Sequence, residues 1–399
     1  MPNEDPGTVL LAVGALFLLG LATEYIGRAT ALPRVTLLLF FGILLGQNMS
    51  DVLPASIENL FPQITEIALL LVGFLLGGKI TFRDLGTNGK TVLWISLSVV
   101  LVTVPLVAGG LWLFGVPITL AVLLGGIATA TDPAATTDVI RENNASGPFT
   151  DTLRGIVAID DAWGLIVFSV ILTVLQLGAE IDAPLDSLWH GIRELSGSVL
   201  LGVLVGIPMA YFTGRLKPGE PTLIEALGIV FFCGGLANYF QVSFLLSAMV
   251  LGCTVSNLAQ HHERPFHAIE DIEWPFMILF FVLTGASLQL TNLETVLPLA
   301  SMYIVFRISG RLLGTWPGAF ITGADSNTRR WMGMAMLPQA GVASGMALLA
   351  GKAFPELHDT LLAVTIMATI VFELVGPIVT RISLRQVGDI PQTLINENR

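Results

Sequence analysis

Residues 156–168 read IVAIDDAWGLIVF, an apolar stretch that carries two adjacent carboxylates, Asp160 and Asp161. The stretch lies in an apolar run over 152–177, which is long enough to cross a bilayer as one helix. At a rise of 1.5 Å per residue, Asp161 is ~14 Å into this run, near the bilayer midplane. Ionisable groups at that depth are costly and mark transport paths or catalytic sites. The stretch therefore predicts a membrane helix with a functional acid pair at its centre.

The composition extends this interpretation to the whole chain. Of its 399 residues, 53% are hydrophobic and 12% are charged, and the mean hydropathy is +0.78. Soluble domains carry about 25% charged residues, so lipid must be the solvent for most of this apolar surface. The net charge of -11 is scattered over loops and a few spans, and it argues against a nucleic-acid partner. We expect an integral membrane protein whose outer surface contacts lipid.

Apolar runs of spanning length follow one another along the chain, and no long linker or low-complexity segment separates a soluble domain. They predict an all-α integral membrane protein of about thirteen transmembrane helices, with residues 1–399 forming a single transporter domain. The predicted spans are 7–26, 33–48, 60–79, 91–113, 117–140, 152–177, 189–213, 222–239, 242–258, 272–290, 295–321, 330–351 and 358–381.

The basic residues test this count independently. Of the 19 lysines and arginines, only Arg193 and Lys352 lie in odd-side loops, and Arg307 and Arg311 lie inside a span. All the others lie in even-side loops or the C-terminal tail. Because basic loops stay in the cytoplasm, we expect the N-terminus outside and the C-terminus in the cytoplasm of a cell (inner) membrane.

The fifth predicted span is interrupted by Thr131, Asp132 and Pro133. A proline removes a backbone donor and clashes with the carbonyl four residues earlier. Carbonyls freed near Pro133, together with Thr131 and Asp132, are oxygen ligands that suit a hard cation. The alternative is a kinked helix in which Asp132 caps the second half. The two interpretations are compatible.

The twelfth predicted span is interrupted in the same way by Pro338, Gln339 and Gly341. Two interrupted spans in corresponding places of two halves are the best sequence indication of a transporter site. Span five lies seven before span twelve, and span six lies seven before span thirteen. Seven is odd, so each pair crosses the membrane in opposite directions. The spacing therefore predicts inverted repeats.

Two arginines lie inside the eleventh predicted span. Arg307 and Arg311 are four residues apart and share one helix face. An unpaired arginine at that depth is very unfavourable, so each needs an anion. Asp160 is a candidate partner for one arginine, and Glu373 in the last span for the other. Charge balance alone does not decide which arginine pairs with Asp160.

Taken together, these motifs resemble the monovalent cation:proton antiporter superfamily over nearly the whole chain. Asp160-Asp161 is similar to the paired-aspartate motif of the NhaA/NapA-like branch, and Thr131-Asp132-Pro133 is similar to the Thr-Asp-Pro signature of the NhaP-like branch. The resemblance implies that discontinuous spans five and twelve cross. It also implies that Asp161 carries the ion and that Asp160 pairs with a basic residue.

The resemblance further implies a homodimer in which a core moves against a scaffold. The core comprises the spans near 91–177 and 295–381, and the scaffold, which also forms the dimer interface, those near 7–79 and 222–290. A linker helix near 189–213 joins them. No cofactor is expected apart from the transported monovalent cation and H⁺. Oxygen ligands suit Na⁺, Li⁺ and K⁺ alike, and only the resemblance favours Na⁺.

One position departs from the family pattern. The paired-aspartate branch usually has a lysine where this chain has Arg311, with Arg307 one turn away. A buried lysine can lose its proton, but an arginine effectively cannot. We therefore expect Arg311 to keep Asp160 charged, which leaves Asp161 as the exchanging group and favours one-for-one exchange. The paired acids alone predict electrogenic exchange.

The function expected from the sequence is antiport of Na⁺, or of Li⁺ or K⁺, against H⁺ by competition at Asp161. A sodium-coupled symporter or a cation channel on a related fold is the alternative. An intramembrane aspartyl protease would need Tyr-Asp and Gly-x-Gly-Asp signatures, but Thr131 precedes Asp132 and Ile159 precedes the acid pair. The chain is therefore not expected to be an enzyme.

Overall fold

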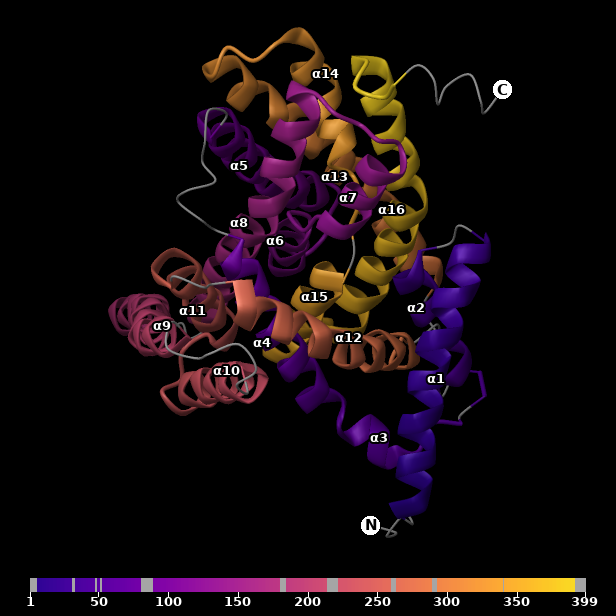
Figure 1. The fold of residues 1–399 in the computed structure, drawn as a ribbon, viewed down its shortest axis with the longest axis vertical. Coiled ribbons are helices and arrows are strands. Elements are labelled where there is room, and N and C mark those ends of the chain that lie inside the picture. The colour runs from indigo at the N-terminus through magenta and orange to yellow at the C-terminus, as the bar shows by residue number, and fades with distance from the viewer. Residues whose placement is uncertain are drawn as a thin grey trace. The chain divides into compact units, whose positions relative to one another are not determined.

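The protein is described here by a computed structural model, in which every regular element is a helix (Figure 1). This confirms the all-α fold for the described part of the chain. The residues described are 6–30, 33–46, 49–50, 52–79, 89–179, 184–213, 222–259, 263–288, 293–339 and 341–391.

Contacts between the helices divide the chain into two compact units. Unit 1 comprises Met1–Gly78 and Ser196–Leu293, and unit 2 comprises Lys79–Leu195 and Glu294–Arg399. The break at Ser196 falls within one long helix, α9 (Pro184–Thr213), so this helix contributes to both units.

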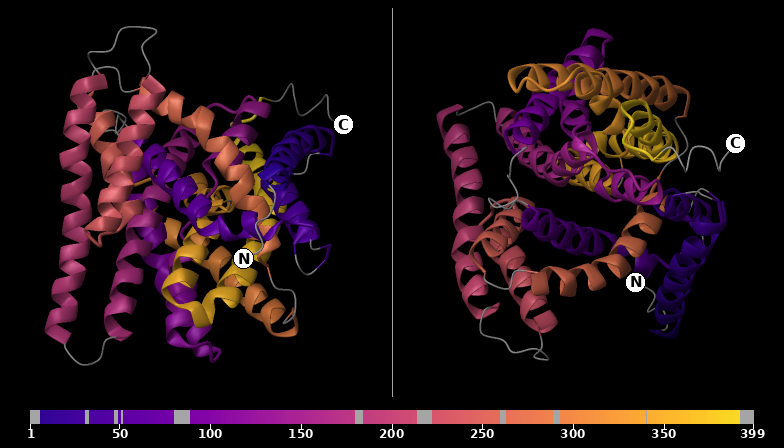
Figure 2. Two further views of the ribbon diagram at one scale, coloured as in Figure 1. Left: turned by 90° about the horizontal axis from the view of Figure 1, so that it is seen from below. Right: turned by 45° about the horizontal axis from the view of Figure 1, so that its top comes forward.

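Unit 1 is built around α4. The unit contains α1 (Pro6–Thr30), α2 (Arg34–Leu45), α3 (Ala55–Asn59), α4 (Phe61–Gly78), most of α9, α10 (Thr222–Tyr239), α11 (Phe244–Leu258) and α12 (Glu263–Ala286). Helix α4 packs against α11 and α12, as Figure 2 shows. Helices α2 and α12 meet backbone to backbone, since a Cβ added at Gly42 would lie 2.2 Å from the carbonyl oxygen of Val282. Small residues allow such close packing between membrane helices.

Two acids of unit 1 that had no predicted role have partners within the unit. Glu24 on α1 forms an ion pair with Arg34 at the start of α2, with 3.4 Å between the charged atoms. The amide of Asn238 on α10 donates a hydrogen bond to Glu66 on α4. Both contacts join neighbouring helices.

Unit 2 contains both interrupted spans and the acid pair. Its helices are α5 (Gly89–Leu113), α6 (Ile118–Ile127), α7 (Pro133–Glu142), α8 (Pro148–Ala179), α13 (Leu293–Ile321), α14 (Ser326–Ala335), α15 (Gly341–Ala353) and α16 (His358–Val387), with a 3₁₀ turn at Pro355–Leu357.

Helix α13 presents a row of small residues, Gly310, Gly314 and Gly318, to α5. A Cβ added at Gly314 would lie 2.8 Å from the Cα of Val99. The hydroxyl of Ser98 donates to the carbonyl of Gly314 at 2.7 Å and accepts from the amide of Gly318 at 3.1 Å. This close packing fixes the helix that carries both buried arginines.

Each predicted span coincides with a helix or a helix pair, and the five-residue α3 lies between two spans. Spans five and twelve are the discontinuous pairs α6/α7 and α14/α15, which confirms the two interrupted helices. By length and composition, seven of the described helices can cross a membrane. Four shorter apolar helices are Arg34–Leu45, Ile118–Ile127, Leu223–Tyr239 and Phe244–Leu258. The total of thirteen spans stays a prediction.

The tenth span was predicted to begin at residue 272, but α12 begins at Glu263. His267, which falls between the predicted spans 242–258 and 272–290, is therefore helical, and its ring lies 3.2 Å from the carboxylate of Glu270. Hydropathy detects only the lipid-buried length of a helix, so polar turns beyond it were assigned to a loop.

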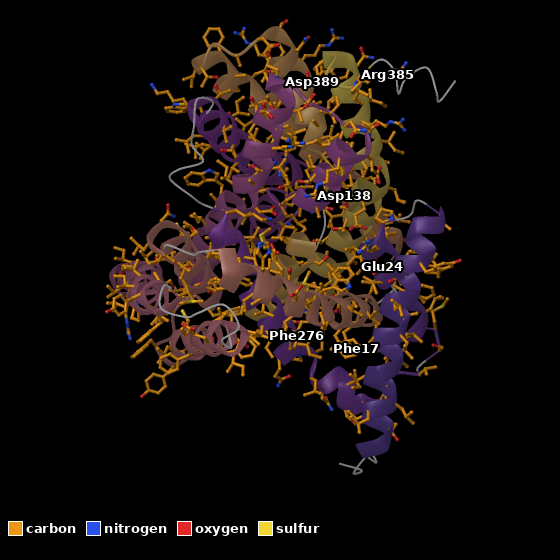
Figure 3. The ribbon with its side chains drawn as sticks, viewed as in Figure 1. Phe17, Glu24, Asp138, Phe276, Arg385 and Asp389 are labelled. Carbon is orange, nitrogen blue, oxygen red and sulfur yellow. The ribbon has the colours of Figure 1, made fainter. Side chains whose placement is uncertain are left out.

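The start of α8, the helix with the acid pair, is capped by the C-terminal segment. Gly147 precedes α8 and has no side chain with which to cap it. The Asp389 carboxylate, just beyond α16 (Figure 3), accepts hydrogen bonds from the amide of Thr150 at 2.9 Å and from its hydroxyl at 2.7 Å. A negative charge stabilises the positive end of a helix dipole. Asp389 thus holds the first turn of α8.

Candidate functional site

The first break separates α6, which ends at Ile127, from α7, which begins at Pro133. Asp132 is the N-cap of α7, and its carboxylate accepts from the amide of Ala135 at 3.0 Å. Proline is favoured at the first helical position because its missing N–H has no intrahelical role there. The residue pair that predicted the break is therefore also the start signal of α7.

The second break separates α14, which ends at Ala335, from α15, which begins at Gly341. The predicted break residues Pro338 and Gln339 lie between the two half-helices, and Gln339 is fully buried. Its amide lies 3.4 Å from the hydroxyl of Tyr303 on α13. This break therefore places a buried amide in the interior of unit 2.

Helix α8 carries Asp160 and Asp161, whose exposed fractions are 0% and 1%. Thr131, in the first break, donates twice to Oδ1 of Asp161, from its amide at 2.9 Å and from its hydroxyl at 3.0 Å. Oδ2 of Asp161 has no hydrogen-bond partner among the described residues. One carboxylate oxygen is thus held in place, and the other is free to take a ligand.

Arg311 on α13 forms a buried ion pair with Asp160. The distance between Nη1 of Arg311 and Oδ2 of Asp160 is 2.5 Å, and both side chains are 0% exposed. The structure thus shows which of the two arginines pairs with Asp160. The two adjacent acids therefore have different surroundings. Asp160 is bound to the permanent cation of Arg311, and Asp161 is bound to the neutral Thr131.

The carbonyl oxygens freed at the first break are occupied by the two arginines. Arg307 donates to the carbonyls of Ala128 at 3.2 Å and Ala130 at 2.7 Å. Arg311 donates to Ala130 at 3.1 Å and to the carbonyl of Thr129. Positive charges at the C-terminal end of α6 interact favourably with the negative end of its helix dipole, and their N–H groups donate to its unpaired carbonyls. Each of these three carbonyls thus accepts a hydrogen bond from a guanidinium, and the use of carbonyls at this break as cation ligands stays a prediction.

Arg307 also joins the two breaks. Its third hydrogen bond, 2.9 Å long, goes to the carbonyl of Leu337 in the second break. Its guanidinium lies over the ring of Phe372 on α16, 4.2 Å from the centroid. One side chain thus contacts both interrupted spans and the last helix, which brings the two breaks together in the interior of unit 2.

Glu373, the carboxylate predicted to pair with an arginine, is buried on α16 with an exposed fraction of 2%. The described hydrogen bonds of Arg307 go to carbonyl oxygens. An electrostatic role for Glu373 beside Arg307 stays a prediction.

Sequence reasoning missed the carbonyl acceptors of the arginines and the buried hydroxyl of Tyr303. Backbone oxygens have no residue signature, so no signal could have identified them. Tyr303, by contrast, is four residues before Arg307 and fully buried. Its spacing on the arginine face of α13 was a usable signal.

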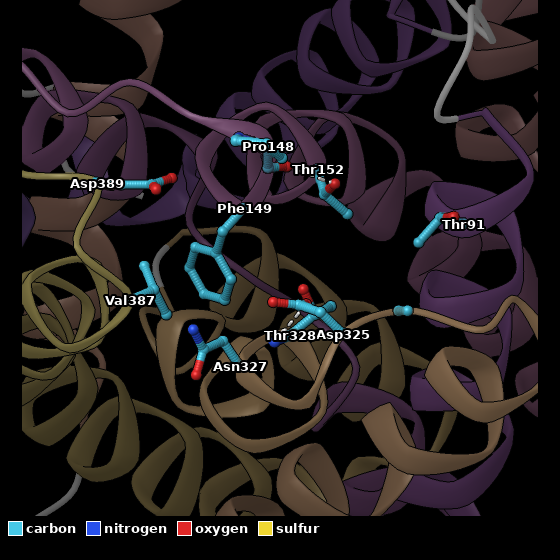
Figure 4. A pocket seen from close by; sticks show the side chains of 10 residues that line it. Thr91, Pro148, Phe149, Thr152, Asp325, Asn327, Thr328, Val387 and Asp389 are labelled. Carbon is cyan, nitrogen blue, oxygen red and sulfur yellow. Dashed lines mark hydrogen bonds between the residues drawn. The ribbon is translucent and has the colours of Figure 1, made fainter.

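A cavity of about 350 Å³ lies elsewhere in unit 2 (Figure 4). Phe149, Asp325 and Asp389 line it, and none of its lining residues is a predicted site residue. Among the described residues there is also no cluster of three or more His, Cys, Asp or Glu that could hold a metal ion. The acid pair itself is buried, with exposed fractions of 0% and 1%.

The family model described as sodium/hydrogen exchanger, transmembrane, matches residues 13–386. The chain belongs to this family. The exchanger is therefore a multi-pass membrane antiporter of sodium and protons and not an enzyme.

Two relatives cover most of the exchanger's length. The ammonium/H⁺ antiporter subunit AmhT of Alkalihalophilus pseudofirmus is 22% identical over 77% of this chain and 79% of its own. The Na⁺/H⁺-K⁺ antiporter GerN of Bacillus cereus is 23% identical over 85% of this chain and 88% of its own.

The solved structure of the sodium proton antiporter MjNhaP1 from Methanocaldococcus jannaschii shares the fold of the exchanger. It matches with a TM-score of 0.74 and 19% identity over 94% of this chain and 97% of that one. This likeness confirms the fold class.

Proposed function

We propose that the exchanger binds its cation and its proton in turn at Asp161. The observation that carries this proposal is the arrangement of that carboxylate, in which Thr131 holds Oδ1 and Oδ2 lacks a partner among the described residues. A buried charged oxygen without a hydrogen bond is strongly unfavourable. A proton or a desolvated monovalent cation removes that penalty, and one oxygen cannot hold both.

Competition at one carboxylate couples the two gradients. In one orientation, deprotonated Asp161 binds the cation with help from Asp132, whose carboxylate is also buried at the first break. Neutralising Asp161 lowers the cost of moving the site across the low-dielectric barrier. In the other orientation a proton displaces the cation, and the protonated site returns. Thr131 supports the cation indirectly, because its amide and hydroxyl position the carboxylate.

The distribution of basic residues supports a membrane arrangement for this proposal. The N-terminus lies outside and the C-terminus lies in the cytoplasm, since nearly all lysines and arginines fall in even-side loops or the tail. Unit 2 moves as the core, because it holds both breaks and the acid pair, while unit 1 remains a scaffold in contact with lipid and with a second copy in a homodimer.

Cation addition is expected to collapse a proton gradient in everted vesicles that contain the exchanger. A pH-sensitive dye reports the gradient, and Na⁺, Li⁺ and K⁺ are added in turn between pH 6 and 9. NH₄⁺ is scored only as the excess over vesicles that lack the exchanger, because NH₃ crosses the bilayer and dissipates the gradient by itself. The relatives are named for Na⁺, K⁺ and ammonium, so the active ions identify the substrate of this chain. If none of these ions moves protons in the absence of an organic solute, symport replaces antiport as the function.

Exchange is expected to be electroneutral, with one proton per cation. Asp160 is bound to Arg311 at 2.5 Å, and arginine effectively keeps its proton. Only Asp161 then changes its occupant. In proteoliposomes, sodium-driven proton movement should not change when valinomycin and K⁺ set the membrane potential. A current whose reversal potential requires two protons per cation would contradict this expectation.

A further inference from the structure

Three buried hydroxyl groups on the last two helices of unit 2, α15 and α16, have no hydrogen-bond partner among the described residues. They belong to Ser344 on α15 and to Thr365 and Thr369 on α16, and each side chain is 0% exposed. Other buried threonines of the same unit donate to the carbonyl one turn earlier, as Thr315 does to Arg311 at 2.9 Å and Thr380 does to Gly376 at 3.0 Å. The three hydroxyls therefore depart from the local pattern.

Helix periodicity places the three hydroxyls at the packed interface of α15 and α16. On α15, Gly351 faces His358, since an added Cβ would lie 3.0 Å from the Cα of that histidine. Ser344 precedes Gly351 by seven residues, or two turns, and so shares its face. On α16, Gly376 faces the second break, where an added Cβ would lie 2.7 Å from the Cα of Pro338.

The same two contacts set the level at which the hydroxyls meet. Thr369 and Thr365 precede Gly376 by about two and three turns and share its face. Helices α15 and α16 are antiparallel, because Gly351 pairs with His358 and Pro338 pairs with Gly376. Ser344 is seven residues before Gly351, so the first contact places it opposite Thr365, seven residues after His358. Ser344 is six residues after Pro338, so the second contact places it opposite residue 370, six residues before Gly376. The three hydroxyls therefore gather at one level of one interface.

We propose that this interface binds ordered water. A buried hydroxyl without a partner is unfavourable, and a buried water typically makes about three hydrogen bonds to such groups. The hydroxyls carry no charge and the guanidinium of Arg307 lies over Phe372 on α16, which favours a neutral ligand over a second cation. The buried Glu373, one turn after Thr369, makes a cation the alternative that the experiment must test.

Ser344 is in the first turn of α15, where backbone N–H groups lack intrahelical partners. The water also accepts hydrogen bonds from the free N–H groups of this turn. In α7 the carboxylate of Asp132 fills the same role for the amide of Ala135.

X-ray radiolysis of the exchanger in lipid nanodiscs tests the site, because bound water produces hydroxyl radicals that label adjacent side chains. Leu348 and Leu362 are both buried and each lies about one turn from a hydroxyl. They are expected to be labelled above Leu71, a fully buried leucine of unit 1. The variant Ser344→Ala/Thr365→Val/Thr369→Val should reduce this labelling to the level of Leu71. The matched variant Thr380→Val should leave it unchanged. Labelling at the Leu71 level in the wild type would overturn the proposal.

Thermal unfolding gives a second, independent readout. In a hydrated site, Thr369→Val removes a partner of the water and lowers Tm. In a dry interface, the same change removes an unpaired polar atom and raises Tm, which contradicts the proposal. The measurement is repeated on Asp161→Asn protein in NaCl and in choline chloride. A Na⁺-dependent rise in Tm that Thr369→Val abolishes would show that the site binds a cation and not water, which overturns the proposal.

Discussion

Replacing Asp161 with asparagine is expected to reduce cation-dependent proton movement to that of vesicles without the exchanger. The amide keeps the volume of the carboxylate, and its oxygen can still accept from the amide and hydroxyl of Thr131, so the fold is retained. An amide, however, neither takes up a proton near neutral pH nor offers a negative charge to a cation. Both halves of the exchange cycle are lost together.

The matched control is Asp151→Asn, which makes the same chemical change in the first turn of the same helix, at an exposed position. This variant should exchange at the wild-type rate in the dye assay. Elution of Asp161→Asn as a single folded species on size-exclusion chromatography separates loss of exchange from loss of protein. Sodium-dependent proton movement by a folded Asp161→Asn exchanger would show that another group carries the ion.

The interrupted helices were predictable because proline and small polar residues within apolar runs have a direct backbone consequence. Pro133 and Asp132 supply both a stop for α6 and a start for α7. The pairing of Asp160 with an arginine was also within reach of the sequence. A buried arginine requires an anion, and the chain offers few acids at the right depth. Both inferences rest on properties that the residue type alone determines, namely the backbone geometry of proline and the charge of arginine and aspartate.

The occupied carbonyls and the unpartnered hydroxyls were not predictable from the sequence. Every residue has a carbonyl, so nothing marks Ala128 and Ala130 as acceptors for arginines on a distant helix. A threonine in a helix usually donates to a carbonyl of its own preceding turn, and only the structure shows that the hydroxyl of Thr369 lacks a partner among the described residues. The residues that bind the cation stay a prediction, whereas these hydrogen-bond partners could be found only from the structure.

Removing the charge of Arg311 is expected to destabilise the exchanger more than any other single change at the site. Arg311→Gln leaves the Asp160 carboxylate buried without a cation, and breaking a buried pair in this way costs about 3–5 kcal/mol. The variant also loses hydrogen bonds to the carbonyls of Thr129 and Ala130 at the end of α6. Its Tm in detergent should fall well below that of the wild type.

The variant Asp160→Asn/Arg311→Gln separates these two contributions. It removes both charges, so the penalty of an unpaired buried carboxylate disappears, while the carbonyls of α6 still lack the guanidinium. Its Tm should therefore lie between those of Arg311→Gln and the wild type. Arg311→Lys should also be intermediate, because an ammonium keeps the charge but cannot span Asp160 and the carbonyls with a planar fork. If Arg311→Gln melts no lower than the double variant, the ion pair with Asp160 does not stabilise the fold. Arg311 would then stabilise the protein only through its hydrogen bonds to the carbonyls of Thr129 and Ala130.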